Sequence, residues 1–197
     1  MDIEYIRRIG IAAAYKGGRV LRHFLGKVSR IEKKGAIDLV TEADTGAEKV
    51  IIETIRQRFP DHSVLAEESG LSSGNARCRW IIDPLDGTTN FAHGLGQFAV
   101  SIAFALDKEI VAGVVLNPVS GELFSAAKGG GAQLNGQPIR VSDTERVSES
   151  LLVTGFPYNL KEISAPLMAR FGKCLLAARG IRRLGSAALD LCFVACG

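Results

Sequence analysis

The first regular pattern along the chain is a spacing of apolar residues that fits helices. The spacing of apolar residues in 2–25 is typical of one amphipathic helix. A second helix is expected after Thr41, a favoured N-cap residue, with Asp44 at the capping-box position. That helix should end at Phe59-Pro60, because proline cannot continue it. Its apolar stripe consists of Val50, Ile51, Ile52 and Ile55.

Runs of β-forming residues indicate strands around and after these helices. A short strand is expected at residues 37–40, and SVLAEES (63–69) and RWIID (79–83) are two strands that each run into acids. Residues 70–79 are interpreted as a polar loop between them. An apolar run follows at 98–106. Three consecutive antiparallel strands are then predicted in IVAGVVLNP, GELFSAAKG and GAQLNGQPIRVS, the last with a hairpin turn at Asn135-Gly136.

The last quarter of the sequence starts a new unit. SLLVTGF (150–156) predicts a strand and residues 164–179 a helix, while GIRRLGSAALDLCFVACG contains a short strand, a Gly-Ser turn and a final helix. Helices mixed with antiparallel strands predict an α+β layered sandwich. We expect residues 1–145 to form one α+β domain and residues 146–197 to begin a second, α/β domain, which we expect to be incomplete at its C-terminal end.

Composition excludes several classes of function. With 47% hydrophobic and 23% charged residues, the chain has the profile of a globular protein. A net charge of +3 is too small to indicate binding to nucleic acid or to a membrane surface. No apolar run approaches the roughly 18 residues of a membrane span. The densest basic spot is interpreted as a solvated turn and consists of Arg179, Arg182 and Arg183.

The cysteines and the N-terminus indicate the compartment. None of the four cysteines forms a C-x-x-C motif, so buried reduced thiols are favoured over a zinc site. The N-terminal helix carries an acid and arginines among its apolar residues, which differs from a signal peptide. These features predict a cytoplasmic protein.

Candidate chemistry begins where two of the predicted strands end in acids. If the strands are neighbours, Glu67, Asp83 and Asp86 converge at one sheet edge. Each pair of carboxylates about 4 Å apart costs about 4 kcal/mol at an effective dielectric near 20, so such a cluster requires cations. The donors are all oxygen, which favours Mg²⁺, with Mn²⁺ or Ca²⁺ as alternatives, over zinc.

The residues around Asp86 predict an anion site beside these acids. Pro84 is expected to end the strand and to turn the Leu85 carbonyl inward as a further oxygen ligand. Gly87 permits a sharp turn, and residues 88–90 favour a helix start whose free N–H groups bind anions. Taken singly, these segments are also typical of a surface turn, a solvated strand end and a helix cap. Together they favour metal-assisted phosphate chemistry.

Four segments resemble the inositol monophosphatase family, whose members are Mg²⁺-dependent, lithium-sensitive phosphomonoesterases. WIIDPLDGTTNFAHG (80–94) is similar to the first signature of that family, and DLVTEAD (38–44) and LAEES (65–69) are similar to its two upstream motifs. LGSAALDLCFVACG (184–197) resembles the segment that leads to its last motif, and bacterial members resemble the chain most. The resemblance implies an α/β/α/β sandwich, a small phosphorylated polyol substrate and a homodimer.

The resemblance also implies roles for individual residues. Glu67, Asp83 and Asp86 would ligate Mg²⁺ together with the Leu85 carbonyl. The Thr88 hydroxyl and Glu67 would orient the attacking water for in-line displacement, and Asp44 would act from an outer position. Lys33 matches a family lysine near the site. Phosphate and substrate would contact Gly87, Thr88, Thr89, Gly185, Ser186 and Ala187.

One feature of the family pattern is not found in the sequence. The second signature, a Trp-Asp pair whose aspartate is a further metal ligand, has no counterpart, since Trp80 is the one tryptophan. We therefore expect the 197 residues to be a weak phosphatase.

The spacing of the acids decides against one rival, since haloacid-dehalogenase phosphatases carry their paired acids two residues apart, whereas here they are three apart. Two alternatives stay open. A non-catalytic fragment or paralogue that acts as a binding module is the alternative from another class. Among substrates, nucleotide 3′-phosphate and fructose bisphosphate remain beside inositol phosphate.

Overall fold

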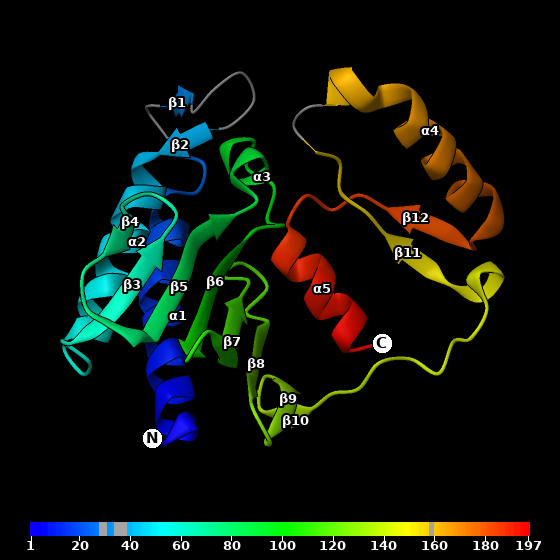
Figure 1. The fold of residues 1–197 in the computed structure, drawn as a ribbon. Helices are drawn as coiled ribbons and strands as arrows, with labels where there is room; N and C mark the ends of the chain where they lie inside the picture. The colour runs from blue at the N-terminus through cyan, green and yellow to red at the C-terminus, as the bar shows by residue number, and fades with distance from the viewer. Residues whose placement is uncertain (28–30, 34–38, 158–159) are drawn as a thin grey trace.

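The computed structural model describes residues 1–27, 31–33, 39–157 and 160–197 (Figure 1). Two long helices, α1 (Ile3–Phe24) and α2 (Glu42–Arg56), pack against each other. The Asp2 side chain caps α1 by accepting a hydrogen bond from the Tyr5 N–H at 3.0 Å. Gly17 lets the helices approach closely, because a Cβ atom there would lie 2.6 Å from Ile51 Cδ1.

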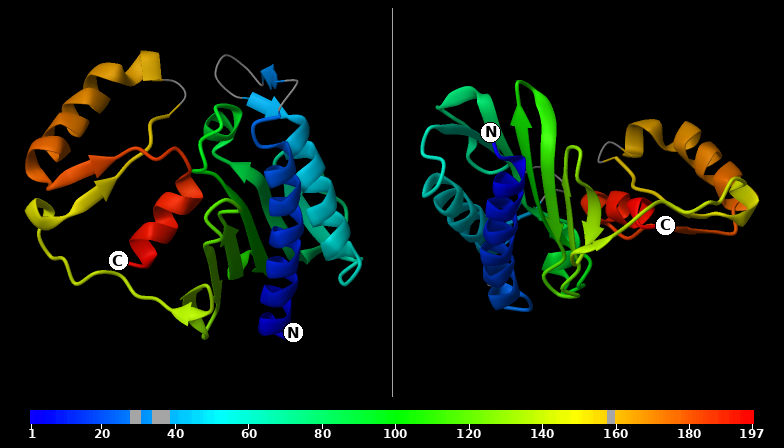
Figure 2. Two further views of the ribbon diagram at one scale, coloured as in Figure 1. Left: turned by 180° about the vertical axis from the view of Figure 1, so that it is seen from behind. Right: turned by 90° about the horizontal axis from the view of Figure 1, so that it is seen from below.

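The helices cover one face of an eight-stranded mixed sheet (Figure 2). Two of its inner strands, paired with each other, are β5 (Asn75–Asp86) and β6 (Ala99–Leu106). Only β3 pairs in parallel, with β5, and the other pairings are antiparallel. The remaining strands are β3 (His62–Ala66), β4 (Gly70–Ser72), β7 (Glu109–Leu116), β8 (Leu123–Ala127), β9 (Gly131–Leu134) and β10 (Gln137–Pro138).

Buried and half-buried side chains alternate along the strands, and the buried ones form the core between the helices and the sheet. On β5, Cys78, Trp80 and Ile82 are buried, whereas the residues between them are only half-buried. Trp80 packs beside Phe104 of β6, with ring centroids 5.1 Å apart. This core fixes the direction in which β5 leaves the sheet at its C-terminal end.

A second unit lies on the other face of the sheet (Figures 1 and 2). Helix α5 (Ala187–Ala195) packs on this face, where Leu189 joins Ala99 and Phe124 in a small apolar cluster. Beyond α5 lies a two-stranded parallel sheet of β11 (Leu151–Val153) and β12 (Gly180–Arg182), with α4 (Leu160–Ala177) beside it. The short elements are β1 (Ile31–Lys33), β2 (Leu39–Thr41), α3 (Thr88–Ala92) and a 3₁₀ turn, η1 (Val147–Glu149).

The predicted α+β layered architecture is confirmed, as is the turn at Asn135-Gly136. Both turn residues have positive φ, 49° and 81°, as a two-residue hairpin requires. The polar loop predicted at 70–79 is wrong, because β4 occupies Gly70–Ser72 and β5 already begins at Asn75. β4 is an edge strand without a buried residue, so no alternation could reveal it. The domain division at residue 145 stays a prediction.

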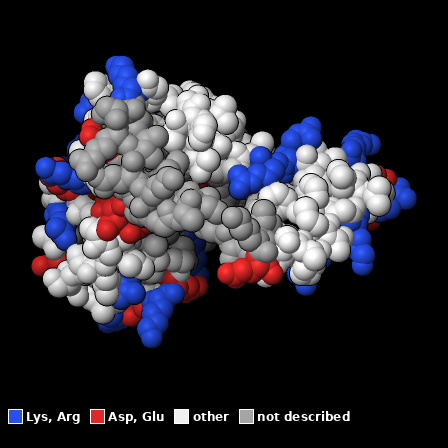
Figure 3. Space-filling model, turned by 90° about the horizontal axis from the view of Figure 1, so that it is seen from above, with Lys and Arg blue, Asp and Glu red and all other residues white. Residues whose placement is uncertain are grey.

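Helix length and surface charge bear on whether the chain offers a membrane span or a charged binding face. None of the helices in the described part of the chain is long and apolar enough to cross a membrane. On the face seen from above, lysine and arginine side chains are scattered among acidic and uncharged residues (Figure 3).

The contribution of His62 to stability should decrease as the pH falls. The Trp80 indole N–H donates to His62 Nδ1 at 3.1 Å, and the His62 ring stacks on Phe59. Burial lowers the pKa of His62 from its ordinary 6.5, and nearby Asp61 opposes this only in part. The native state therefore binds the proton less readily than the unfolded chain, so this contribution is present above about pH 6.5 and is lost as pH falls through the lowered pKa.

Urea unfolding followed by the fluorescence of Trp80, the single tryptophan, measures this effect. His62→Gln keeps an acceptor for the indole but does not titrate, so the unfolding free energy of the wild type relative to this variant should decrease between about pH 7.5 and pH 5.5. A difference between the two proteins that stays the same at both pH values would contradict the prediction.

Candidate active site

The acid-bearing end of β5 is built around a bulge. Asp83 pairs with Ser101 of β6 and Asp86 with Ala99, so three steps on β5 match two on β6. Pro84, which lacks an N–H, occupies the irregular stretch. The prediction that Pro84 ends the strand is thus wrong, since β5 continues to Asp86. Within the bulge the Leu85 N–H donates to Asp83 Oδ1 at 3.0 Å.

Glu67 meets Asp83 because β3 runs parallel to β5. The last register pair is Ala66 with Ile82, and the Glu67 N–H donates to the Ile82 carbonyl at 3.1 Å. The two strands are therefore neighbours, and their acids share a side-chain hydrogen bond. Burial, followed by the charges of Glu67 and Asp86, raises the pKa of Asp83 from 3.8 to about 8.

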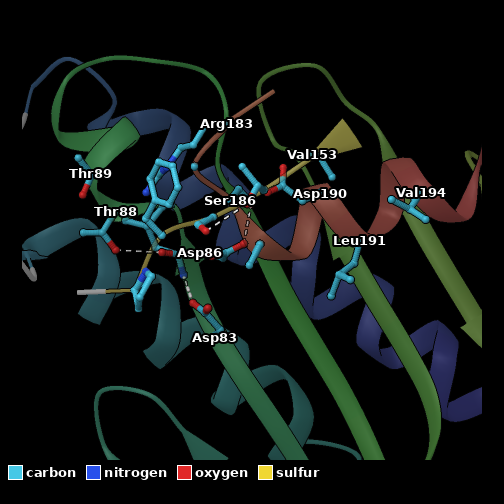
Figure 4. Close-up of a pocket in the computed structure, with 18 of the residues that line it drawn as sticks. Asp83, Asp86, Thr88, Thr89, Val153, Arg183, Ser186, Asp190, Leu191 and Val194 are labelled. Atoms are coloured by element: carbon cyan, nitrogen blue, oxygen red, sulfur yellow. Dashed lines mark hydrogen bonds between the residues drawn. The ribbon is translucent and has the colours of Figure 1, made fainter. Parts of the chain in front are cut away.

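Asp86 connects the sheet to the second unit. Its Oδ2 accepts hydrogen bonds from the Ser186 hydroxyl at 2.6 Å and from the Ala188 N–H at 2.7 Å (Figure 4). Ser186 is itself the N-cap of α5 and accepts from the Leu189 N–H. Asp86 therefore accepts a hydrogen bond from an N–H group in the first turn of α5. Its negative charge also interacts favourably with the positive end of the helix dipole.

Gly87 and Thr88 begin the short helix α3. Gly87 has φ 99°, and a Cβ atom there would lie 3.0 Å from the Gln97 carbonyl oxygen, so a larger residue would be strained and crowded. The Thr88 hydroxyl donates to the Leu85 carbonyl at 3.1 Å. Helical bonding begins with the Phe91 N–H to the Gly87 carbonyl, which leaves the N–H groups of residues 88–90 outside that pattern.

Asn90 holds α3 against the loop that precedes α5. Its Nδ2 donates to the carbonyls of Gln97 at 2.6 Å and Leu184 at 2.7 Å. The sequence marks Asn90 as a helix-start residue, but its partner Leu184 lies 94 positions away and carries no local signal.

The acids at the ends of β3 and β5 and the starts of α3 and α5 border one cavity of about 810 Å³ (Figure 4). Among the described side chains, every predicted site residue except Asp44 lines it, including Thr89 and the substrate-facing residues Gly185, Ser186 and Ala187. Asp44 is buried on α2, outside the lining. The lining residues that the sequence analysis did not assign are Val153, Thr154, Gly155, Phe156, Pro157, Arg183, Asp190, Leu191 and Val194.

Asp190 is the one further acid in this lining. Its Oδ1 is buried and has no hydrogen-bond partner among the described residues. Burial and the charge of Asp86 raise the pKa of Asp190, whereas Arg183 opposes the shift. The side chains of Lys33 and Thr41, which the sequence analysis also named, lie outside the described residues.

The donor chemistry fits a hard divalent cation. Glu67, Asp83 and Asp86 face one cavity together with Leu85, and burial followed by the charges of the other two acids raises the pKa of Asp83. Within the described residues, however, no three His, Cys, Asp or Glu side chains stand close enough to form a metal site. One Asp86 oxygen, Oδ2, accepts hydrogen bonds from the start of α5. The assignment of these residues as ligands stays a prediction.

Removal of the Asn90 amide should loosen the second unit. Asn90→Ala leaves the Gln97 and Leu184 carbonyls without their donor, so the unfolding free energy should fall by about 2 kcal/mol. Hydrogen exchange near residues 183–187 should become faster. The matched control is Asn75→Ala, whose side chain bonds only to nearby Arg77, and it should cost less than about 0.5 kcal/mol. Equal costs would show that Asn90 is not a tether.

The raised pKa of Asp83 predicts an unusual pH dependence. In metal-free buffer the folded protein holds a proton on Asp83 that the unfolded chain releases near its ordinary 3.8. This stabilising contribution is full below about pH 4 and is lost as pH rises through about 8. Urea unfolding at about pH 5 and pH 8 should show a fall that Asp83→Asn lacks. An identical pH dependence in Asp83→Asn would contradict the assignment.

Comparison with known proteins identifies the family. Residues 2–197 match the inositol monophosphatase family. Inositol-1-monophosphatase of Synechocystis is 46% identical over 199 residues, which cover 100% of this chain and 69% of that protein. Nus factor SuhB of Escherichia coli K12 is 42% identical over 192 residues, covering 96% and 72% of the two chains.

Solved structures give the same result. The extragenic suppressor protein SuhB of Bartonella henselae superposes with a TM-score of 0.94 at 40% identity, over 98% of this chain and 75% of that one. Inositol monophosphatase from Anabaena gives a TM-score of 0.88 at 43% identity, over 100% and 73%. This chain belongs to the inositol monophosphatase family and is a phosphatase of the inositol monophosphatase and SuhB type.

Proposed function

We propose that the protein is a Mg²⁺-dependent phosphomonoesterase that hydrolyses inositol monophosphate or a similar small polyol phosphate. The observation that carries the proposal is the shared cavity, where the acids of β3 and β5 face the first residues of α3 and α5. Such a cavity brings carboxylate donors and backbone N–H groups to one substrate. Metal-assisted phosphate hydrolysis needs both.

Glu67, Asp83, Asp86 and the Leu85 carbonyl would hold the cation. Mg²⁺ bound there would neutralise phosphate charge and supply an activated water. Glu67 and the Thr88 hydroxyl would orient that water for in-line attack, with inversion at phosphorus. Thr88 is already held near the Leu85 carbonyl by a 3.1 Å hydrogen bond, so this orientation requires little rearrangement. Asp44 would act from an outer position.

The start of α3 would bind the phosphate. The N–H groups of Gly87 and Thr88 are outside the helical hydrogen bonds of α3, and Gly87 keeps the backbone open to an approaching oxygen. Thr89 lines the same side of the cavity. The polyol would then extend toward Gly185, Ser186 and Ala187 at the start of α5.

The choice of substrate follows the relatives. Proteins of Solanum lycopersicum named inositol monophosphatase 3 and inositol monophosphatase 2 are 40% and 43% identical to this chain, which favours inositol phosphate over nucleotide 3′-phosphate or fructose bisphosphate. The same likeness leads us to propose inhibition by lithium, a homodimer and a cytoplasmic location.

A second candidate is a non-catalytic binding module. Relatives that are 42–43% identical bear the name Nus factor SuhB, which does not refer to a phosphatase activity. Catalysis and binding predict different outcomes in one assay, because only catalysis releases phosphate.

Phosphate release from inositol monophosphate, nucleotide 3′-phosphate and fructose bisphosphate tests the proposal. We expect Mg²⁺-dependent release, fastest from inositol monophosphate and abolished by EDTA. Asp83→Asn and Asp86→Asn should lower kcat/KM by roughly 100-fold or more, since each removes a charge aimed at the reacting centre. The control Asp143→Asn changes an exposed acid (92% exposed) and should have no effect. A protein that releases phosphate from none of the three substrates would favour the binding module.

A further inference from the structure

Glu48 is a buried acid that no role proposed above explains. It lies on α2, one turn after Asp44, and only 4% of its surface is exposed. Its Oε2 accepts a hydrogen bond from the Glu68 N–H at 2.9 Å, and its Oε1 accepts one from the Ser69 N–H at 3.0 Å. Both carboxylate oxygens therefore bind consecutive N–H groups of one loop.

This arrangement costs free energy that only the loop compensates. Burial of a carboxylate is unfavourable unless hydrogen bonds replace its water, and charged acceptors make stronger bonds than neutral ones. A buried apolar residue at position 48 would avoid the cost of desolvation altogether. The acid is thus well suited to hold the backbone of residues 68–69 in place rather than to fill space.

The loop held by Glu48 is the one that carries Glu67. β3 ends at Ala66 and β4 begins at Gly70, so residues 67–69 are the whole connection. The Glu67 N–H is bound to the Ile82 carbonyl of β5 at 3.1 Å. Two anchors therefore hold the backbone around Glu67. Its own N–H is bonded to β5, and the next two N–H groups are bonded to the Glu48 carboxylate.

We infer that Glu48 is a positioning residue that directs the Glu67 carboxylate toward Asp83. This inference rests on the proposed function, in which Glu67 ligates Mg²⁺ and orients water. Without Glu48 the loop loses two hydrogen bonds, and Glu67 keeps its backbone bond to β5 while its side chain gains freedom. Loss of a group that orients a metal ligand typically lowers metal affinity by about 10–100-fold.

Glu48→Gln is the first variant, because it keeps the shape but replaces one acceptor oxygen with an NH₂ group that faces an N–H. The Mg²⁺ concentration for half-maximal activity should rise by about 10–100-fold, while kcat at saturating Mg²⁺ should stay within about threefold. Calorimetric titration with Mn²⁺ should show the same weakening without substrate. Glu48→Asp keeps the charge on a shorter side chain, so its Mg²⁺ affinity should lie between those of Glu48→Gln and the wild type. It replaces Glu48→Gln in the test if that variant does not fold.

Thr54→Val is the matched control for a purely structural effect. Thr54 is buried on the same helix, and its hydroxyl donates to the Val50 carbonyl of that helix at 2.7 Å. It should lower stability without changing the Mg²⁺ requirement. If Glu48→Gln loses stability as Thr54→Val does and keeps the wild-type Mg²⁺ requirement, Glu48 is structural only and the inference is overturned.

The assay separates this failure from a failure of the proposed function. If Asp86→Asn abolishes Mg²⁺-dependent hydrolysis and Glu48→Gln leaves the Mg²⁺ requirement unchanged, the positioning role alone is rejected. If the wild-type protein neither binds Mn²⁺ nor hydrolyses a phosphomonoester, the proposed function is rejected, and the positioning role is rejected with it.

Discussion

The bond between Asp86 and the start of α5 is the constraint on which the arrangement of the site depends. A single carboxylate oxygen accepts hydrogen bonds from the Ser186 hydroxyl and the Ala188 N–H. Asn90 donates a further hydrogen bond to the carbonyl of Leu184, two residues before Ser186. These contacts join segments about 100 residues apart and close the cavity on its second side. Charge favours the bond as well as geometry, since a negative group at a helix start is stabilised by the helix dipole.

At the same end of β5, the negative charges of neighbouring acids repel one another. Asp83 lies between Glu67 and Asp86 and holds its proton up to about pH 8, which shows how strongly the site opposes a further negative charge. An anionic phosphate would meet that opposition too, unless a cation entered with it. Catalytic sites commonly tolerate such a local cost, and the rest of the fold compensates for it. Here the compensation comes from the Trp80 core and from the bonds of Glu48 and Asn90.

The sequence predicted those parts of the fold and site that local rules determine. Alternation and the Asn135-Gly136 turn were sufficient for the antiparallel strands, and the residues of 80–94 that line the cavity were recognised from their types and spacing. β4 was missed because an exposed edge strand has no burial pattern. Glu48 and the lining residues 153–157 were missed because their partners are distant in sequence, and an acid on a helix is ordinarily solvated.

The two anchors of Glu67 explain why the strand order matters for the chemistry. β3 pairs with β5 in parallel, so both acid-bearing ends reach the same sheet edge, and α2 carries two buried acids, Asp44 and Glu48. An antiparallel β3 would place Glu67 at the opposite edge, and the residues that line the cavity could not converge. Residues 67–69 join β3 to its antiparallel neighbour β4, and the chain returns from β4 to β5. This short connection carries Glu67 at the place where the acids meet, and the two N–H bonds to Glu48 hold it there.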